Sequence, residues 1–104
     1  MPEIMARVEA EDFDRWLQSH RAQAGQRCAY GMTDGPVYRD VDSPNAAFVH
    51  IHVEDLARAG QWFRTNEFME ATRQAGVIRR EFYLAAKQER SEAQEILSHR
   101  GLPA

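Results

Sequence analysis

The chain has 104 residues, of which 43% are hydrophobic and 28% are charged, and its formal net charge is −3. This length fits one domain and excludes a two-domain enzyme, because domains usually run to roughly 100–150 residues. The apolar content excludes a disordered tail, and the mild acidity offers no excess positive charge to attract nucleic acid or an anionic membrane. We therefore expect the partners to be small molecules or a second copy of the chain.

Cellular location and redox chemistry are inferred from what the sequence lacks. No apolar stretch approaches the ~20 residues needed to cross a bilayer, and the first residues do not resemble a signal peptide. Cys28 is the only cysteine, which excludes an internal disulfide and a thiolate metal cluster. These features predict a cytoplasmic protein. Arginine supplies twelve of the thirteen basic residues, a bias that we attribute to the composition of the genome.

The first half of the chain predicts a strand, a helix and a second β region. Residues 5–9 alternate between two faces, as a half-buried strand does. From Asp12 the apolar residues recur at helical spacing, and Gly25 predicts a left-handed end of this helix. The segment 27–40, which includes Cys28, is rich in β-formers but is interrupted at 33–36. It forms either two short strands or one strand with a large bulge.

The second half predicts a strand, a broken helical segment and a last strand. In the strand 46–53, the two histidines and Phe48 share one face, and the β-branched residues share the other. A helix begins at Asp55 and ends near Thr65 or Asn66, and Asn66 caps a second helix that ends at Gly76. Residues 78–86 alternate again and predict the last strand. The remaining residues, 87–104, are expected to form a tail with a short helix.

The predicted order β-α-β-β-α-β gives an α+β domain of the ferredoxin-like type over residues 1–86. Such a domain has a four-stranded antiparallel sheet with its helices on one face. We expect Met5, Phe48 and Phe82 to line the uncovered face, where an apolar patch marks an interface. The sequence therefore predicts a homodimer that forms through this face of the sheet.

Several segments of this pattern resemble one family of small proteins. They are residues 12–16, 37–40, 42–45, 47–53, 68–69 and 75–77. Over about the first 86 residues the chain resembles the dimeric α+β barrel proteins, which include the antibiotic biosynthesis monooxygenase-like group, polyketide cyclases and many uncharacterised small bacterial proteins. The resemblance implies a homodimer with a pocket beside the sheet. It leaves the chemistry open, because this fold hosts several activities.

The resemblance also implies a class of ligand. Cofactor-independent monooxygenases of this family hold an aromatic substrate among Asn, Trp, Tyr and Arg side chains, and this chain offers the same residue types in Asn66, Trp62, Tyr83 and Arg80. The haem-degrading branch needs a histidine after the third strand, and none lies between His52 and His99. No phosphate-binding loop, nucleophile elbow or His-Glu-x-x-His motif is present. We therefore expect no cofactor, and we expect a hydrophobic ligand of an aromatic or polyketide-like kind.

The histidines are the candidate catalytic residues. His50 and His52 point the same way from one strand, so they can exchange protons with a bound substrate or bind a metal. Alternatively, they are polar residues that form hydrogen bonds within a hydrated dimer interface. A metal needs a third ligand, and no residue lies at a characteristic spacing, so we expect no metal. His20 lies on the apolar stripe of the first helix and is either a core residue or a group that faces a pocket.

The candidate substrate-binding residues are chiefly aromatic. They are Trp16, Phe48, Trp62, Tyr83 and Arg80. Aromatic rings can form the wall of a pocket for a flat ligand, and an arginine can hold a carboxylate or an enolate oxygen. The same rings are also what the core of a small domain needs. Two hypotheses remain open: a cofactor-independent monooxygenase, cyclase or isomerase, and a non-catalytic ligand-binding or stress-response dimer.

Overall fold

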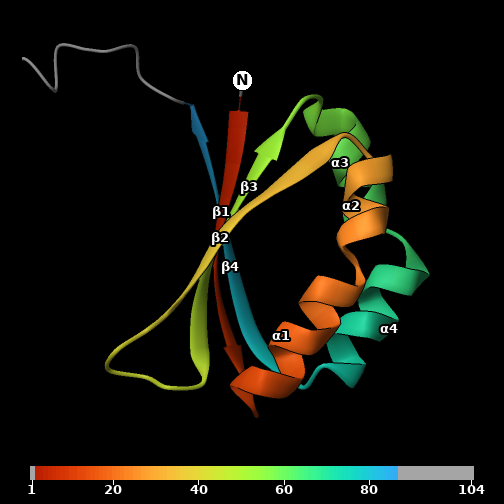
Figure 1. Cartoon of the computed structure of the whole chain (residues 1–104). Helices are drawn as coiled ribbons and strands as arrows, with labels where there is room; N and C mark the ends of the chain where they lie inside the picture. Colours follow the sequence, from red (N-terminus) through yellow and green to blue (C-terminus); the bar gives the residue numbers. More distant parts are fainter. Residues whose placement is uncertain (1, 87–104) are drawn as a thin grey trace, which may run out of the picture.

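The structure is a computed structural model that describes residues 2–86. The predicted tail helix lies outside the described residues. The elements are β1 (Pro2–Ala10), α1 (Phe13–Ala22), α2 (Ala24–Ala29), β2 (Met32–Arg39), β3 (Ala46–Val53), α3 (Leu56–Phe63), α4 (Asn66–Gln74) and β4 (Val77–Ala86). The strands form one antiparallel sheet in the order β2-β3-β1-β4, and all four helices lie on one of its faces (Figure 1). The predicted ferredoxin-like α+β fold is confirmed, with each crossover built from two short helices.

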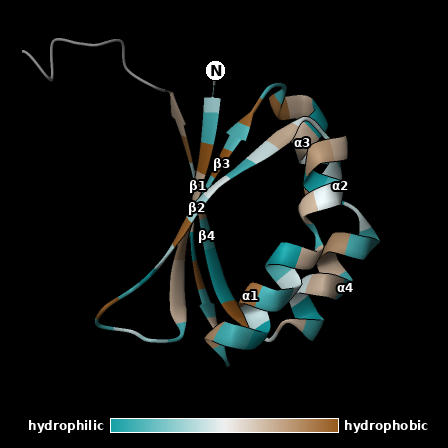
Figure 2. Cartoon of the chain, viewed as in Figure 1, coloured by the Kyte–Doolittle hydropathy of each residue, from teal (hydrophilic) through white to brown (hydrophobic). Residues whose placement is uncertain are grey.

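The two faces of the sheet are occupied by alternating residues. Along β1 and β3, hydrophobic and hydrophilic segments follow one another (Figure 2). Ala6 pairs with Val49 on the face that the helices cover, and both side chains are buried. Met5 and Phe48 lie on the opposite face, where they are 46% and 44% exposed. Helices on one side only therefore leave the other side of the sheet open, as the strand pattern predicts.

Phe82 corrects one part of that prediction. Its partner across the β1–β4 ladder is Ala6, and directly opposed residues of an antiparallel pair point to the same face. Phe82 therefore faces the helices. Its neighbour Tyr83, which pairs with Met5, takes a place on the uncovered face.

The first crossover differs from the sequence-based expectation. Gly25 is not a helix end, because it lies within α2, and the left-handed turn occurs at Gly31, where φ is 77°. Cys28 is consequently an exposed residue of a helix and not a strand residue. The strand β2 begins only at Met32 and shifts its register between Asp34 and Val37. Of the two alternatives for this region, one strand with a bulge is correct.

The second crossover agrees with the prediction except at one cap. Asp55 caps α3 by accepting hydrogen bonds from two backbone N–H groups, and Gly76 ends the helical segment with a φ of 73°. The side chain that caps α4 belongs to Thr65 and not to Asn66, because the Thr65 hydroxyl accepts a hydrogen bond from the N–H of Phe68. No helix between residues 2 and 86 is both long enough and apolar enough to cross a membrane.

Candidate functional site

The predicted site residues are divided between the two faces of the sheet. Four of them line a pocket between the helices and the sheet, namely Trp16, His20, Trp62 and Arg80. The other four, Phe48, His50, His52 and Tyr83, lie on the uncovered face. Asn66 is exposed at the start of α4 and does not line the pocket. The structure therefore presents two separate candidate sites where the sequence suggested one.

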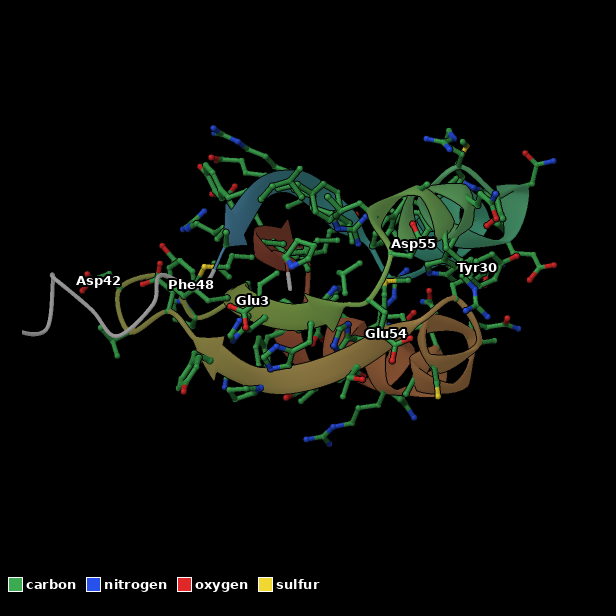
Figure 3. All side chains as sticks on the ribbon, turned by 90° about the horizontal axis from the view of Figure 1, so that it is seen from above. Glu3, Tyr30, Asp42, Phe48, Glu54 and Asp55 are labelled. Atoms are coloured by element: carbon green, nitrogen blue, oxygen red, sulfur yellow. The ribbon has the colours of Figure 1, made fainter. Side chains whose placement is uncertain are left out.

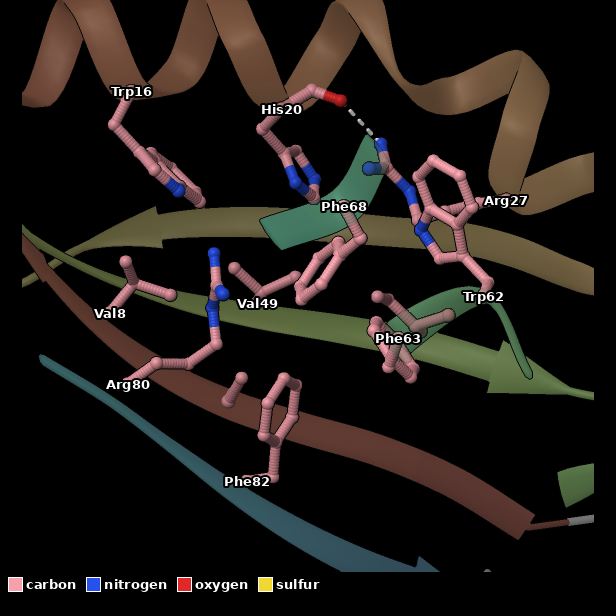
Figure 4. Close-up of a pocket in the computed structure, with 12 residues that line it drawn as sticks. Val8, Trp16, His20, Arg27, Val49, Trp62, Phe63, Phe68, Arg80 and Phe82 are labelled. Atoms are coloured by element: carbon pink, nitrogen blue, oxygen red, sulfur yellow. Dashed lines mark hydrogen bonds between the residues drawn. The ribbon is translucent and has the colours of Figure 1, made fainter. Parts of the chain in front are cut away.

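The pocket is enclosed by both layers of the fold. Helices α1 to α4 contribute Trp16, His20, Arg27, Trp62, Phe63 and Phe68, and the sheet contributes Val8, Val49, Arg80 and Phe82 among others (Figure 4). The space is about 40 Å³, enough for a few water molecules. Trp16 and Trp62 are also members of the hydrophobic core. The two tryptophans therefore belong both to the core and to the pocket wall.

His20 is held in this pocket as a neutral imidazole. Its ring stacks on Trp16 with 5.0 Å between ring centroids. Burial, assisted by the positive charges of Arg27 and Arg80, lowers the pKa of His20 to about 4. Desolvation disfavours the charged form of a histidine, so the ring carries no proton charge at neutral pH. A neutral imidazole beside a pocket is able to accept a proton.

Arg27 is a buried arginine that forms an ion pair with the more exposed Asp34. Its guanidinium donates to both carboxylate oxygens of Asp34, at 2.6 and 2.8 Å, and also to the backbone carbonyl of His20. Burial acts to raise the pKa of Asp34, but the hydrogen bonds and the charge of Arg27 outweigh it, and the pKa lies below its usual value. The charge of Arg27 is therefore already compensated by protein groups.

Arg80 differs from Arg27 because no carboxylate between residues 2 and 86 pairs with it. Its guanidinium donates to the hydroxyl of Thr72 at 3.0 Å and lies 4.9 Å from the ring centre of Phe68. Burial lowers the pKa of Arg80 to about 10, so it remains charged at neutral pH. The close-up in Figure 4 shows this side chain rising from β4 toward the helices. A partly desolvated positive charge with unused N–H donors favours an anionic group in the pocket.

Trp62 supplies a second donor without a partner. The side chain is 2% exposed, and its indole nitrogen Nε1 is the buried side-chain polar atom that lacks a hydrogen-bond partner in the described structure. Buried indole N–H groups usually have a partner, because leaving one unpaired costs about 1–3 kcal/mol. Trp62 lines the same pocket as Arg80.

An apolar groove adjoins the pocket along β4. It has a volume of about 230 Å³ and is lined by Ile4, Leu56, Ala59, Gly60, Phe63, Phe82 and Leu84. Phe63 and Phe82 also line the pocket, and their rings contact one another at 5.3 Å between centroids. These two side chains therefore border both the pocket and the groove.

The second candidate site is on the uncovered face of the sheet. There the carboxylate of Glu3 contacts both predicted histidines, with 2.8 Å to Nε2 of His50 and 2.7 Å to Nδ1 of His52. Figure 3 shows Glu3 and Phe48 on the part of the sheet that lies away from the helices, whereas Tyr30 is in the helical layer. The hydrogen bond from His50 lowers the pKa of Glu3. The carboxylate of Glu3 thus lies where a third ligand would be needed, a contact that the sequence spacing did not indicate.

Sequence reasoning missed Glu3 and Arg27 for different reasons. Glu3 belongs to the alternation that includes Met5, but its approach to His52 depends on the register between β1 and β3, which one sequence does not display. Arg27 was placed in a β region, and Asp34 in a turn. The sequence analysis did not predict α2, which extends to Ala29 and turns Arg27 toward the sheet.

Comparisons with known proteins bear on the fold. No family model matches the chain, and no curated protein sequence matches it. Among solved structures, an antibiotic biosynthesis monooxygenase is 14% identical with a TM-score of 0.64, and the match covers 84% of this chain and 98% of that one. A conserved protein from Methanosarcina mazei is 15% identical with a TM-score of 0.65, covering 84% and 92%. An uncharacterized NIPSNAP domain protein from Burkholderia xenovorans is 9% identical with a TM-score of 0.64, covering 86% and 97%.

These matches define a structural class. The chain has the α+β ferredoxin-like fold of the antibiotic biosynthesis monooxygenase-like proteins, as the resemblance in sequence pattern implied. At 9–15% identity the similarity establishes the fold alone. The activity has to be argued from the site.

Proposed function

We propose that the chain binds a flat hydrophobic molecule with an acidic oxygen in the pocket between helices and sheet. The observation that carries the proposal is Arg80, a partly desolvated guanidinium without a carboxylate partner in residues 2–86, in a pocket otherwise walled by aromatic rings. The unpaired indole N–H of Trp62 offers a further donor to the same ligand. An enolate or phenolate oxygen matches these donors, and its ring system matches the walls.

The same groups support a cofactor-independent reaction. His20 is uncharged at neutral pH and can take a proton from the ligand, and Arg80 stabilises the negative charge that develops on the ligand oxygen. Isomerisation, cyclisation and oxygenation of such molecules all begin with this proton transfer. A bound anion also raises the proton affinity of His20, because it offsets the charges of Arg27 and Arg80.

Monooxygenation is the reaction that we favour. The enolate formed by proton transfer is electron-rich and reduces molecular oxygen, so that a C–O bond forms and a hydroperoxide results. Loss of water from the hydroperoxide leaves a new carbonyl group. One oxygen atom enters the product and the other leaves as water. The resemblance to the antibiotic biosynthesis monooxygenase-like fold supports this choice.

A second candidate function is favoured by the size of the cavity. About 40 Å³ does not hold an aromatic ring system, so binding requires Phe63 and Phe82 to rotate and open the adjoining groove of about 230 Å³. Phe82 is 46% exposed and has room to move. A pocket that is mostly filled by side chains is also expected of a non-catalytic ligand-binding dimer.

We further propose that the functional unit is a homodimer in which two sheets pack through their uncovered faces. Support comes from the exposed apolar side chains on this face, Met5, Tyr38, Phe48 and Tyr83. A hollow of about 270 Å³, lined in part by Met5, Phe48 and Tyr83, lies at its centre and can accept side chains of a second copy.

Tryptophan fluorescence provides a direct test of ligand binding, because both tryptophans of the chain line the pocket. We expect 2-naphthoate to quench this fluorescence at lower concentration than its uncharged methyl ester. The substitution Arg80→Gln should weaken naphthoate binding by roughly 10–100-fold, since a hydrogen bond to a charged group contributes about 1.5–3 kcal/mol. Arg79→Gln is the matched control, because Arg79 is exposed and pairs with Glu81.

Turnover is tested with anthrone, a flat and enolisable ketone that oxygen converts to anthraquinone and water. The wild-type chain should accelerate oxygen consumption above the spontaneous rate, and His20→Gln and Arg80→Gln should each reduce the acceleration. Binding of naphthoate without any acceleration would favour the non-catalytic function. Equal effects of the Arg79 and Arg80 substitutions on binding would contradict the proposed site.

A further inference from the structure

The group formed by Glu3, His50 and His52 is built by the register of two central strands. His50 and His52 are two residues apart on β3, so their side chains leave the same face of the sheet. The β1–β3 ladder places Glu3 directly opposite His52 and diagonally from His50. Hydrogen-bonded central strands thus fix all three Cβ positions, and the group does not depend on a mobile loop.

The three side chains converge on one point. Each carboxylate oxygen of Glu3 faces one imidazole nitrogen, at 2.8 Å for His50 and 2.7 Å for His52. The potential ligand atoms all lie within 4.8 Å of one another. The side chains of Glu3 and His50 are 16% and 27% exposed, and that of His52 is 47% exposed. The group is therefore partly shielded but open to solvent on one side.

The surroundings of Glu3 distinguish the group from an ordinary surface ion pair. Twelve of the thirteen basic residues are arginines, yet no arginine in residues 2–86 forms an ion pair with this half-buried carboxylate. The nearest candidate on the same strand and face, Arg7, is engaged by Glu9 and Asp40. In residues 2–86 the basic groups that pair with Glu3 are both imidazoles, and imidazole is the basic side chain that also binds metal ions.

The bulge in β2 brings Gly35 close to the backbone of β3 at His50. Gly35 lies so close to β3 that a Cβ atom there would come within 2.8 Å of the carbonyl oxygen of His50. The shift of register between Asp34 and Val37 falls opposite this point. Close packing of β2 against His50 limits the movement of that ligand, as expected of a prepared site.

From this geometry we infer that Glu3, His50 and His52 form a binding site for a divalent transition-metal ion, with Zn²⁺ as the preferred ion. Two imidazoles and one carboxylate are a ligand set that zinc uses when it keeps an open coordination position. Ligand atoms around a tetrahedral zinc ion are about 3.3 Å apart, so the two hydrogen-bonded contacts have to open by about 0.5 Å. The widest separation, which is at most 4.8 Å, has to close by no more than about 1.5 Å. The ion takes the place of the proton between each imidazole nitrogen and the carboxylate; in a neutral imidazole this proton moves to the other ring nitrogen, and from an imidazolium it is released to solvent.

The site is independent of the proposed pocket, because it lies on the other face of the sheet. The open coordination positions face outward, toward the side where we place a second copy of the chain. Water or a small anionic ligand can occupy them. Loss of the metal site would leave the pocket residues Arg80 and His20 in place, so the two proposals can fail separately.

The test is a titration of the full chain with Zn²⁺ in competition with a chromophoric chelator, followed by Co²⁺ as a spectroscopic substitute. We expect one Zn²⁺ per chain and visible d–d absorption from bound Co²⁺. The double substitution H50Q/H52Q should abolish binding. E3Q should weaken it by more than the roughly 10–100-fold that outer-shell partners contribute.

Two control variants make the result specific. Glu81→Gln removes a carboxylate of β4 that is held by Arg79 and Tyr83, and should leave zinc affinity unchanged. His99→Gln removes the remaining histidine outside the pocket, which lies beyond the described residues, and should also have no effect. Far-UV circular dichroism of each variant confirms that it is folded.

The inference is overturned if the wild-type chain binds no Zn²⁺ at micromolar concentration, in which case the group is only a hydrogen-bonded cluster. It is also overturned if H50Q/H52Q retains wild-type affinity, or if His99→Gln alone removes binding.

Discussion

The two faces of the sheet are built from the same strands but carry side chains of different kinds. On β3, Val49 and Ile51 are buried beneath the helices, and the alternating residues Phe48, His50 and His52 lie on the uncovered face. The covered face contains a desolvated arginine and a histidine whose pKa is lowered to about 4 by burial. The uncovered face contains partly exposed imidazoles that bind a carboxylate.

This difference shows that the chemistry available to a side chain depends on whether the helices cover it, and not on its residue type alone. A histidine beneath the helices loses charge because water is excluded, and its available chemistry is proton acceptance. The histidines of the uncovered face are 27% and 47% exposed in the single chain, and the chemistry that we propose for them is metal binding. The distinction makes separate predictions for the two faces.

The largest effect is expected at the uncovered face. If two sheets pack there, the wild-type particle has twice the chain mass of 12.0 kDa, about 24 kDa, in sedimentation or light scattering. Phe48→Lys places a charge beside Arg7 at the centre of this face, and a buried like-charge contact costs several kcal/mol. We expect this variant to be a folded 12.0 kDa monomer.

Leu84→Lys is the matched control for the dimer. Leu84 is an apolar residue that is more exposed than Phe48, at 66% against 44%, but it pairs with Ile4 and so lies on the side of the helices. The control should remain a dimer. A wild-type monomer at micromolar concentration, or an equal loss of mass in both variants, would refute packing through the uncovered face.

Two adjacent residues of β3 test the difference in burial. Ile51→Ala removes a side chain that is buried beneath the helices, and should lower the free energy of unfolding by about 2–5 kcal/mol through lost contacts and a new cavity. His52→Ala removes an exposed side chain of the other face, and should cost less than about 1 kcal/mol. Urea unfolding at one fixed protein concentration measures both. Similar costs for the two variants would mean that the faces are not distinct.

Much of the fold is predictable from local patterns. The alternation in residues 46–53 identifies the two faces of β3, and Asp55 and Gly76 mark helix boundaries that the structure contains. The errors arise where two local signals compete. Gly25 is compatible with either a helix end or a helix interior, and the tertiary contact between Arg27 and Asp34 favours the interior.

The candidate sites were less predictable than the fold. Residue types suggested His50 and His52, but Glu3 joins them only through strand register, which requires knowledge of which strands pair. Arg80 and Tyr83 are three residues apart on β4 and fall on opposite faces. Their assignment to one substrate site treated a list of aromatic and basic residues as a single pocket. The sequence indicated which residues could carry chemistry, but it did not indicate which of them lie side by side in the fold.

The pH dependence of stability tests the burial of His20. Its pKa is lowered by burial to about 4 in the folded chain, against an ordinary value of 6.5. The unfolded chain therefore binds more protons between these pH values, and folding stability falls as pH is lowered from 6.5 to about 4. The loss amounts to roughly 2–3 kcal/mol. His20→Gln does not titrate, so its unfolding free energy should lack this component.

The measurement is the difference in urea unfolding free energy between wild type and His20→Gln at several pH values. The difference cancels the groups that do not interact with His20. Asp34 cancels only in part, because against the effect of burial its pKa is lowered by Arg27 and also by His20, but its contribution is lost below its ordinary value of 3.8 and so leaves the upper part of the range to His20. A pH-independent difference would mean that His20 titrates as it does in water. The helices would then admit solvent to the pocket, Arg80 would be hydrated, and the preference for an anionic ligand would lose its physical basis.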